Sequence, residues 1–258
     1  MFDNLKEDAS VEGEKDSLGG GNFGPWESGV YPDLKITSAY SKLSKGGAMG
    51  IVIHFQDEVN QKELRSTLWA TSGTAKGCKN FYVTQKGDKR YLPGYETFAA
   101  ISKLTLNVAP SDLTTDEKTV MLWSYEDKKD VATQVDMIMP LLGQRVTLGV
   151  TKQIVDKNIN VNGPGETPNY QPTGETREEN EIRKVFSADT GCTTTEVAAG
   201  ETAGGFIVSW GEKNTGLTID KSTKDVAPAA PSSTGSIAFG AATAPADAKP
   251  QAPIFGGA

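Results

Sequence analysis

Between residues 30 and 156, apolar and polar residues alternate within short segments, which predicts a mainly β protein. The most apolar of these segments is Ile51-Val52-Ile53-His54-Phe55. A short loop, Lys86-Gly87-Asp88, separates two other segments and therefore predicts a hairpin. The expected strands span residues 30–39, 48–56, 64–71, 81–85, 89–92, 119–125, 132–139 and 144–156.

Three segments instead have the spacing of apolar residues that is typical of a helix. The first follows Pro93 and extends to about Leu106. The second runs from Thr176 to Phe186, where Thr176 is suited to cap the helix and acidic residues follow in the first turn. A third helix is expected at about residues 205–213. Its expected buried stripe consists of Phe206, Ile207 and Trp210.

The expected order of elements is strand, strand, strand, helix, strand, strand, with an extra hairpin before the helix. The OB-fold, a partly open Greek-key barrel that binds oligonucleotides, has this order. Other small β-barrels share parts of it. The sequence therefore predicts an OB-like five-stranded Greek-key barrel with an inserted hairpin, a few peripheral helices and disordered termini.

Composition divides the chain into four parts. Residues 1–28 form an acidic, Gly-rich N-terminal arm, and residues 29–157 form the OB-like nucleic-acid-binding core. Residues 158–222 form a loop and a helical extension that packs on the core. In residues 223–258, 26 of 36 residues are Ala, Pro, Gly, Ser or Thr. Such a tail cannot bury enough apolar surface to offset its conformational entropy, so we expect it to be disordered.

Two large apolar residues, Ile254 and Phe255, lie near the end of this tail. They are either a chance feature or a short docking peptide for partner proteins. On a tail that otherwise consists mostly of Ala, Pro, Gly, Ser and Thr, these two residues are the candidate partner-docking residues.

The residue types that support catalysis or metal binding are scarce. A structural zinc site usually has four Cys or His ligands, whereas the chain has only His54, Cys78 and Cys192. His54 is expected to be a half-buried strand residue rather than a general base. The G-x-G-x-x-G pattern at residues 19–24 lacks the preceding strand and following helix of a dinucleotide site. We therefore expect no metal, no cofactor and no enzymatic activity.

The sequence also bears on the cellular compartment. No apolar run approaches the roughly 18 residues that a membrane span requires. The first residues are acidic and lack the apolar region of a secretory signal. These features predict a cytosolic protein without a membrane partner.

Charge is segregated along the chain, although its net charge is −7. Residues 35–91 hold ten bases and four acids, and the flanking segments are acidic. Within this block, residues 76–91 carry five bases, one acid and three aromatic residues. Single-stranded nucleic acid presents phosphates to cations and unstacked bases to aromatic rings, so this composition suits it. The alternative is a solvated hairpin with ordinary lysines.

The candidate DNA-binding residues fall into two groups and one open case. Those expected to contact phosphates are Lys42, Lys45, Lys76, Lys79, Lys86, Lys89 and Arg90. Those expected to stack on bases are Phe81, Tyr82 and Tyr91, with Phe81 and Tyr82 on opposite faces of the hairpin. Trp69 is either a core residue or a further stacking platform. Lys42 and Lys45 are expected in the first turn between strands, which commonly frames the ligand of an OB-fold.

Several short motifs resemble those of single-stranded-DNA-binding proteins of tailed bacteriophages, across roughly residues 16–190. They are Gly29-Val30-Tyr31-Pro32, Ser44-Lys45-Gly46-Gly47-Ala48, Thr71-Ser72-Gly73-Thr74-Ala75-Lys76-Gly77, Tyr91-Leu92-Pro93-Gly94, Leu142-Gly143-Gln144 and the segment 173–182. The resemblance implies an OB-like core, replication or recombination work in the host cytoplasm, and a C-terminal tail that recruits phage enzymes. This tail departs from the family in being neutral rather than strongly acidic.

The sequence thus predicts a protein that binds and protects single-stranded DNA during phage DNA replication, recombination or repair. One alternative is a single-stranded-DNA-binding transcription cofactor that recruits a phage RNA polymerase. Another is a structural or assembly protein of the virion. A homo-oligomer is compatible with each of these.

Overall fold

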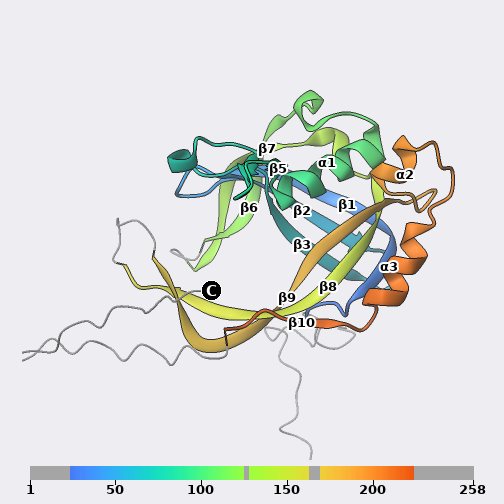
Figure 1. Ribbon diagram of the computed structural model, residues 1–258. Helices are drawn as coiled ribbons and strands as arrows, with labels where there is room; N and C mark the ends of the chain where they lie inside the picture. Colours follow the sequence, from blue (N-terminus) through green and yellow to red (C-terminus); the bar gives the residue numbers. More distant parts are fainter. Residues whose placement is uncertain (1–23, 125–127, 163–168, 224–258) are drawn as a thin grey trace, which may run out of the picture.

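The computed structural model describes residues 24–124, 128–162 and 169–223, which form a mainly β body with a few helices (Figure 1). Most of the expected arm and tail, including Ile254 and Phe255, lies outside the described residues. The strands are β1 (Gly29–Leu43), β2 (Met49–Asp57), β3 (Lys62–Trp69), β4 (Phe81–Val83), β5 (Lys89–Tyr91), β6 (Asp116–Ser124), β7 (Lys129–Met137), β8 (Arg145–Asn160), β9 (Tyr170–Ser187) and β10 (Thr218–Asp220). The α-helices are α1 (Pro93–Leu106), α2 (Thr194–Ala198) and α3 (Phe206–Asn214).

The large sheet is open and almost entirely antiparallel. Its central strands follow the order β3-β2-β1-β8-β9, and short β10 pairs with β8 in parallel. The β6–β7 hairpin joins the sheet through the pairing of Tyr40 in β1 with Met137 in β7. In the described part of the chain, no ladder joins the edge strands β3 and β9. Helix α1 packs against both of these edge strands instead.

The alternation of side chains along β2 explains why the sheet carries apolar groups on both faces. Ile51, Ile53 and Phe55 lie on the inner face and belong to the main core, to which α1 contributes Ile101. Val52 points to the other face, where it packs in a second, smaller cluster under β6 and β7. Because both faces are covered, β2 is almost continuously apolar in sequence.

The helix predicted from Thr176 to Phe186 is wrong, because this segment belongs to strand β9. It pairs with β8 along most of its length, with Val150 opposite Ile182. The loop predicted to start after residue 157 is also shorter, since β8 continues to Asn160. Figure 1 shows β8 and β9 curving together away from the rest of the sheet. Pairing with the long free edge of β8 outweighs the local helical signals of the segment.

Two further expectations need correction. The packed body begins before residue 29, because Trp26 is buried and exchanges two hydrogen bonds of 2.7 Å with the Asn180 side chain. In α3, only Trp210 of the expected stripe is buried, while Phe206 is exposed and Ile207 is half-buried. The helices predicted at α1 and α3 are themselves confirmed.

Candidate nucleic-acid interface

Three residues, one from each of β1, β2 and β3, lie in a row on the outer face of the sheet, beside the turn that follows β1. The strand register places Lys42 opposite Gly50 and Gly50 opposite Trp69. A Cβ atom on Gly50 would lie 3.0 Å from the Trp69 ring, so the ring lies across the glycine. The Lys42 Nζ atom is 5.4 Å from the centre of this ring, which is a cation–π distance. Trp69 is 42% exposed, so it is not a core residue.

Arg65 lies on the same face, although it is not among the DNA-binding residues predicted from the sequence. It occupies the position opposite His54, and its Nη2 atom donates a 3.2 Å hydrogen bond to the Tyr40 hydroxyl. Partial burial, followed by the charge of Arg65, lowers the pKa of Lys42. The signal in the sequence was alternation, because residues 65, 67 and 69 of one strand share a face. His54 is half-buried as expected, and its Nδ1 atom contacts the Glu63 carboxylate.

Two loops beside this row are held together by their backbones. The Thr74 N–H donates to the Gly46 carbonyl at 2.8 Å, which joins the loop after β3 to the turn after β1. A Cβ atom on Gly73 would lie 2.5 Å from the same carbonyl oxygen, so the close approach requires glycine. This contact brings Lys45 and Lys76 to one end of the sheet. Lys42 is in strand β1 rather than in the turn, which corrects its expected position.

The β4–β5 hairpin carries the remaining candidate residues. Phe81 lies opposite Tyr91, and Tyr82 lies opposite Arg90, so the two pairs occupy opposite faces as predicted. Phe81 lies between two cations, with Lys79 Nζ at 5.7 Å and Lys89 Nζ at 5.3 Å from its ring centre. Lys86 lies in the loop of the hairpin.

Neither face of the hairpin is buried against the body. None of its strand residues is buried, and Tyr82 and Tyr91 are 45% and 53% exposed. The Tyr91 ring contacts Tyr95 of α1 at a centroid distance of 4.9 Å. Both faces of the hairpin therefore leave aromatic surface free for a ligand.

The candidate basic residues differ in electrostatic environment from the paired basic residues of β8, although Lys103, Lys184 and Lys213 also lack an ion pair within the described residues. Within the described residues, none of the seven predicted phosphate-binding side chains, nor Arg65, forms an ion pair with a carboxylate. By contrast, Arg145 pairs with Asp33 and Glu58, and Lys152 pairs with Glu27 and Glu178. The face around Trp69 thus concentrates uncompensated positive charge, which attracts a polyanion.

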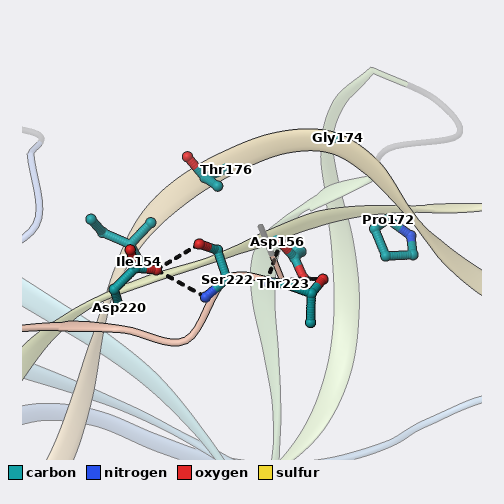
Figure 2. Close-up of a pocket in the computed structure, with 8 residues that line it drawn as sticks. All are labelled: Ile154, Asp156, Pro172, Gly174, Thr176, Asp220, Ser222 and Thr223. Carbon is teal, nitrogen blue, oxygen red and sulfur yellow. Dashed lines mark hydrogen bonds between the residues drawn. The ribbon is translucent and has the colours of Figure 1, made fainter. Parts of the chain in front are cut away.

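A pocket of about 320 Å³ lies away from this face, between β8, β9 and the segment that follows β10 (Figure 2). The Asp156 carboxylate in this pocket accepts a 3.1 Å hydrogen bond from the Thr223 N–H, and Ser222 donates to Asp220. No Lys or Arg lines it, and its carboxylates would repel a phosphate. These hydrogen bonds hold the end of the described chain in place, and the pocket is separate from the candidate nucleic-acid interface.

The described part of the chain contains neither a cluster of metal-ligating side chains nor a helix that could span a membrane. No cluster of three or more His, Cys, Asp or Glu side chains in these ranges is arranged to hold a metal ion. No helix within them is long and apolar enough to cross a membrane. Comparison of the chain with protein-family models, curated proteins and solved structures finds no match.

Proposed function

We propose that this protein binds single-stranded DNA without strong sequence dependence and protects it during phage DNA replication, recombination or repair in the host cytoplasm. One observation carries the proposal: an exposed tryptophan lies beside a lysine on the sheet, among basic side chains that have no carboxylate partner in the part of the chain that the structure describes. Lys and Arg side chains would contact phosphates, while Trp69, Tyr82 and Tyr91 would stack on bases. Binding of this kind requires neither a nucleophile nor a metal.

The strand order supports an OB-like barrel as the scaffold. Three antiparallel strands, β1 to β3, are followed by α1 and then by β8 and β9, with β8 returning to pair with β1. OB-folds bind oligonucleotides on the face of their second and third strands and on adjoining loops. In this chain, the corresponding surface is β2 and β3 with the turn around Lys45. It is the surface on which Trp69 is exposed.

Fluorescence anisotropy with a labelled poly-dT of about 30 nucleotides and a matching duplex tests the proposal, given site sizes of about 4–16 nucleotides per OB-fold. We expect submicromolar binding to the single strand that weakens steeply between about 50 and 200 mM salt, because phosphate contacts release counterions. Duplex binding should be much weaker. Absence of single-strand binding at low salt would contradict the proposal and direct the search to purified virions.

A further inference from the structure

A cleft of about 770 Å³ runs along the free edge of β3, opposite strand β9. Trp69 and Lys76 line one side of it, and residues 179–182 of β9 line the other. The start of α1 also borders the cleft, where Gly94 packs against the Trp69 backbone so closely that a Cβ atom would lie 2.4 Å from its carbonyl oxygen. The cleft is therefore continuous with the proposed DNA-binding face and has a rigid boundary.

The two rims of the cleft differ in charge. Lys76 on the loop rim has no carboxylate partner in the described residues, and Lys45 belongs to the adjoining turn. On the β9 rim, Glu179 and Glu181 each form an ion pair with a basic side chain. A phosphate is therefore attracted to the loop rim more strongly than to the β9 rim, where the charges are balanced. A nucleotide in the cleft would keep its phosphate near the loops and direct its base toward β9.

The β9 rim presents hydrogen-bond acceptors to such a base. The Glu179 Oε1 atom accepts a 2.8 Å hydrogen bond from the Gln153 amide, which fixes the carboxylate in place. Gln153 is 94% buried in the wall of the cleft, and its Oε1 atom has no partner in the described residues. Buried acceptors normally have a donor, and this oxygen lacks one within the described residues. The atom is itself buried, so the Glu179 carboxylate is the acceptor that a base in the cleft would meet, and it favours a base edge that donates.

Pyrimidines differ at this edge. Cytosine carries the N4 amino group, which donates to carboxylates, whereas thymine carries the O4 carbonyl, which accepts. A carboxylate facing O4 leaves two acceptors without a proton between them, which is costly in a site with little water. The two bases have the same ring size, so they stack comparably on Trp69. They also differ at N3, which accepts in cytosine and donates in thymine, and in the thymine methyl group, so the preference for cytosine applies where the group at position 4 faces the carboxylate.

We propose that this cleft takes one base of the bound strand between Trp69 and β9, and that Glu179 makes it prefer cytosine to thymine. The inference rests on the proposed single-stranded-DNA binding and adds a base preference to it. Stacking and phosphate contacts elsewhere on the face remain tolerant of sequence.

The test compares (dC) and (dT) oligonucleotides of about 12 nucleotides, within the usual site size of an OB-fold. It uses the full chain at a pH above neutrality, where cytosine is unprotonated. Glu179→Gln should reduce the ratio of cytosine to thymine affinity at least about fivefold, the low end of one good contact to a base edge. Glu178→Gln is the matched control, because it removes the same charge from the same strand but does not line the cleft.

A second measurement changes the ligand instead of the protein, so it does not depend on the folding of a variant. An oligonucleotide of N4,N4-dimethylcytosine lacks the amino donors, and wild-type protein should bind it at least about fivefold more weakly than the cytosine oligonucleotide. Equal affinities, or equal effects of E179Q and E178Q on the ratio, would overturn the inference while leaving the proposed function intact. Failure to bind any oligonucleotide would overturn the proposed function itself.

Discussion

The basic residues around Trp69 and those on β8 and β9 lie in the same protein but in opposite electrostatic settings. On β8, hydrogen bonds that Lys152 donates to Glu27 and Glu178 raise the pKa of Lys152, so its charge is stabilised within the fold. On β1, partial burial and the nearby Arg65 lower the pKa of Lys42, so its charge is disfavoured. Arg145 and Lys152 on β8 form ion pairs within the fold, whereas the basic side chains around Trp69 have no carboxylate partner in the ranges 24–124, 128–162 and 169–223.

The difference indicates which charges serve structure and which serve a ligand. Exposed ion pairs contribute little to stability, so a fold can omit them at small cost. Placing like charges beside one another is unfavourable, and a polyanion that binds there relieves the repulsion. The unpaired region also exposes Trp69, Tyr82 and Tyr91, whereas Phe186 near β8 is buried and Tyr170 at the start of β9 is exposed. Around Trp69 and on the β4–β5 hairpin, unpaired charge and exposed aromatic surface therefore occur together.

The largest effect on the ligand-binding region is expected from Trp69→Ala. Loss of one stacking ring should weaken single-strand binding by about 1–3 kcal/mol, because base–aromatic stacking contributes that amount per base. The fold should tolerate the change, since the side chain is 42% exposed. Anisotropy titrations report the affinity, and thermal unfolding followed by circular dichroism reports the stability. An unchanged affinity would show that the ring does not stack on DNA.

The structural side of the comparison is tested by Glu196→Gln. Hydrogen bonds from the backbone of Thr193 and Phe206 hold the pKa of Glu196 below its usual value, and Gly205 also donates to it. The charged carboxylate therefore stabilises the fold at neutral pH, and this contribution is lost as pH falls through the folded-state pKa. The variant should be less stable than wild type near neutrality, and the two should converge in acid.

Urea unfolding at a series of pH values measures this convergence. A difference between the proteins that stays constant down to acidic pH would contradict the role assigned to the Glu196 charge. Single-strand affinity at neutral pH should be the same in both proteins, because Glu196 is in α2 and is not part of the candidate interface.

A smaller effect is expected from Gly50→Ala. The new Cβ atom would meet the Trp69 ring at 3.0 Å and the Thr67 methyl group at 3.1 Å, so the exposed ring must move outward. Single-strand affinity should fall by less than in Trp69→Ala, and the unfolding midpoint should hardly change. Tryptophan fluorescence quenching on titration with poly-dT follows the ring directly. A loss of stability without a loss of affinity would mean that Gly50 serves packing only.

The smallest effect is expected where basic side chains are already paired. Lys157 pairs with Glu175, and both are exposed side chains on the β8–β9 ribbon. Replacing Lys157 by Ala should lower the unfolding midpoint slightly and leave poly-dT affinity unchanged. A marked drop in affinity would show that the ribbon takes part in binding, which would remove the contrast between the two regions.

Most of the fold could be predicted where the local pattern agrees with the final pairing. The hairpin around Lys86 and helix α1 are examples, because a tight loop and a Pro-Gly start fix them locally. Strand β9 could not be predicted, because its acidic residues after Thr176 match a helix start. Its partner β8 precedes it across a loop that the pattern does not resolve, and pairing with that strand decides its structure.

The candidate interface could be predicted in part. Composition alone identified the basic and aromatic residues of the segment 76–91. The row of Lys42, Gly50 and Trp69 required the register of three strands, which no local pattern supplies. The cleft opposite β9 depends on an edge strand and on a segment more than 100 residues away, so it emerged only from the tertiary structure.

The central claim is that the basic side chains around Trp69 and on the β4–β5 hairpin bind phosphates, whereas Lys103, Lys184 and Lys213, which also lack a carboxylate partner within the described residues, do not. The salt dependence of binding tests this claim most directly. We would compare the triple variant Lys86→Ala, Lys89→Ala and Arg90→Ala with the equally charged triple variant Lys103→Ala, Lys184→Ala and Lys213→Ala. The first should flatten the slope of log affinity against log salt by about 0.7 for each phosphate that the variant no longer neutralises. The second should keep the wild-type slope. Equal slopes in wild type and both variants would contradict the account.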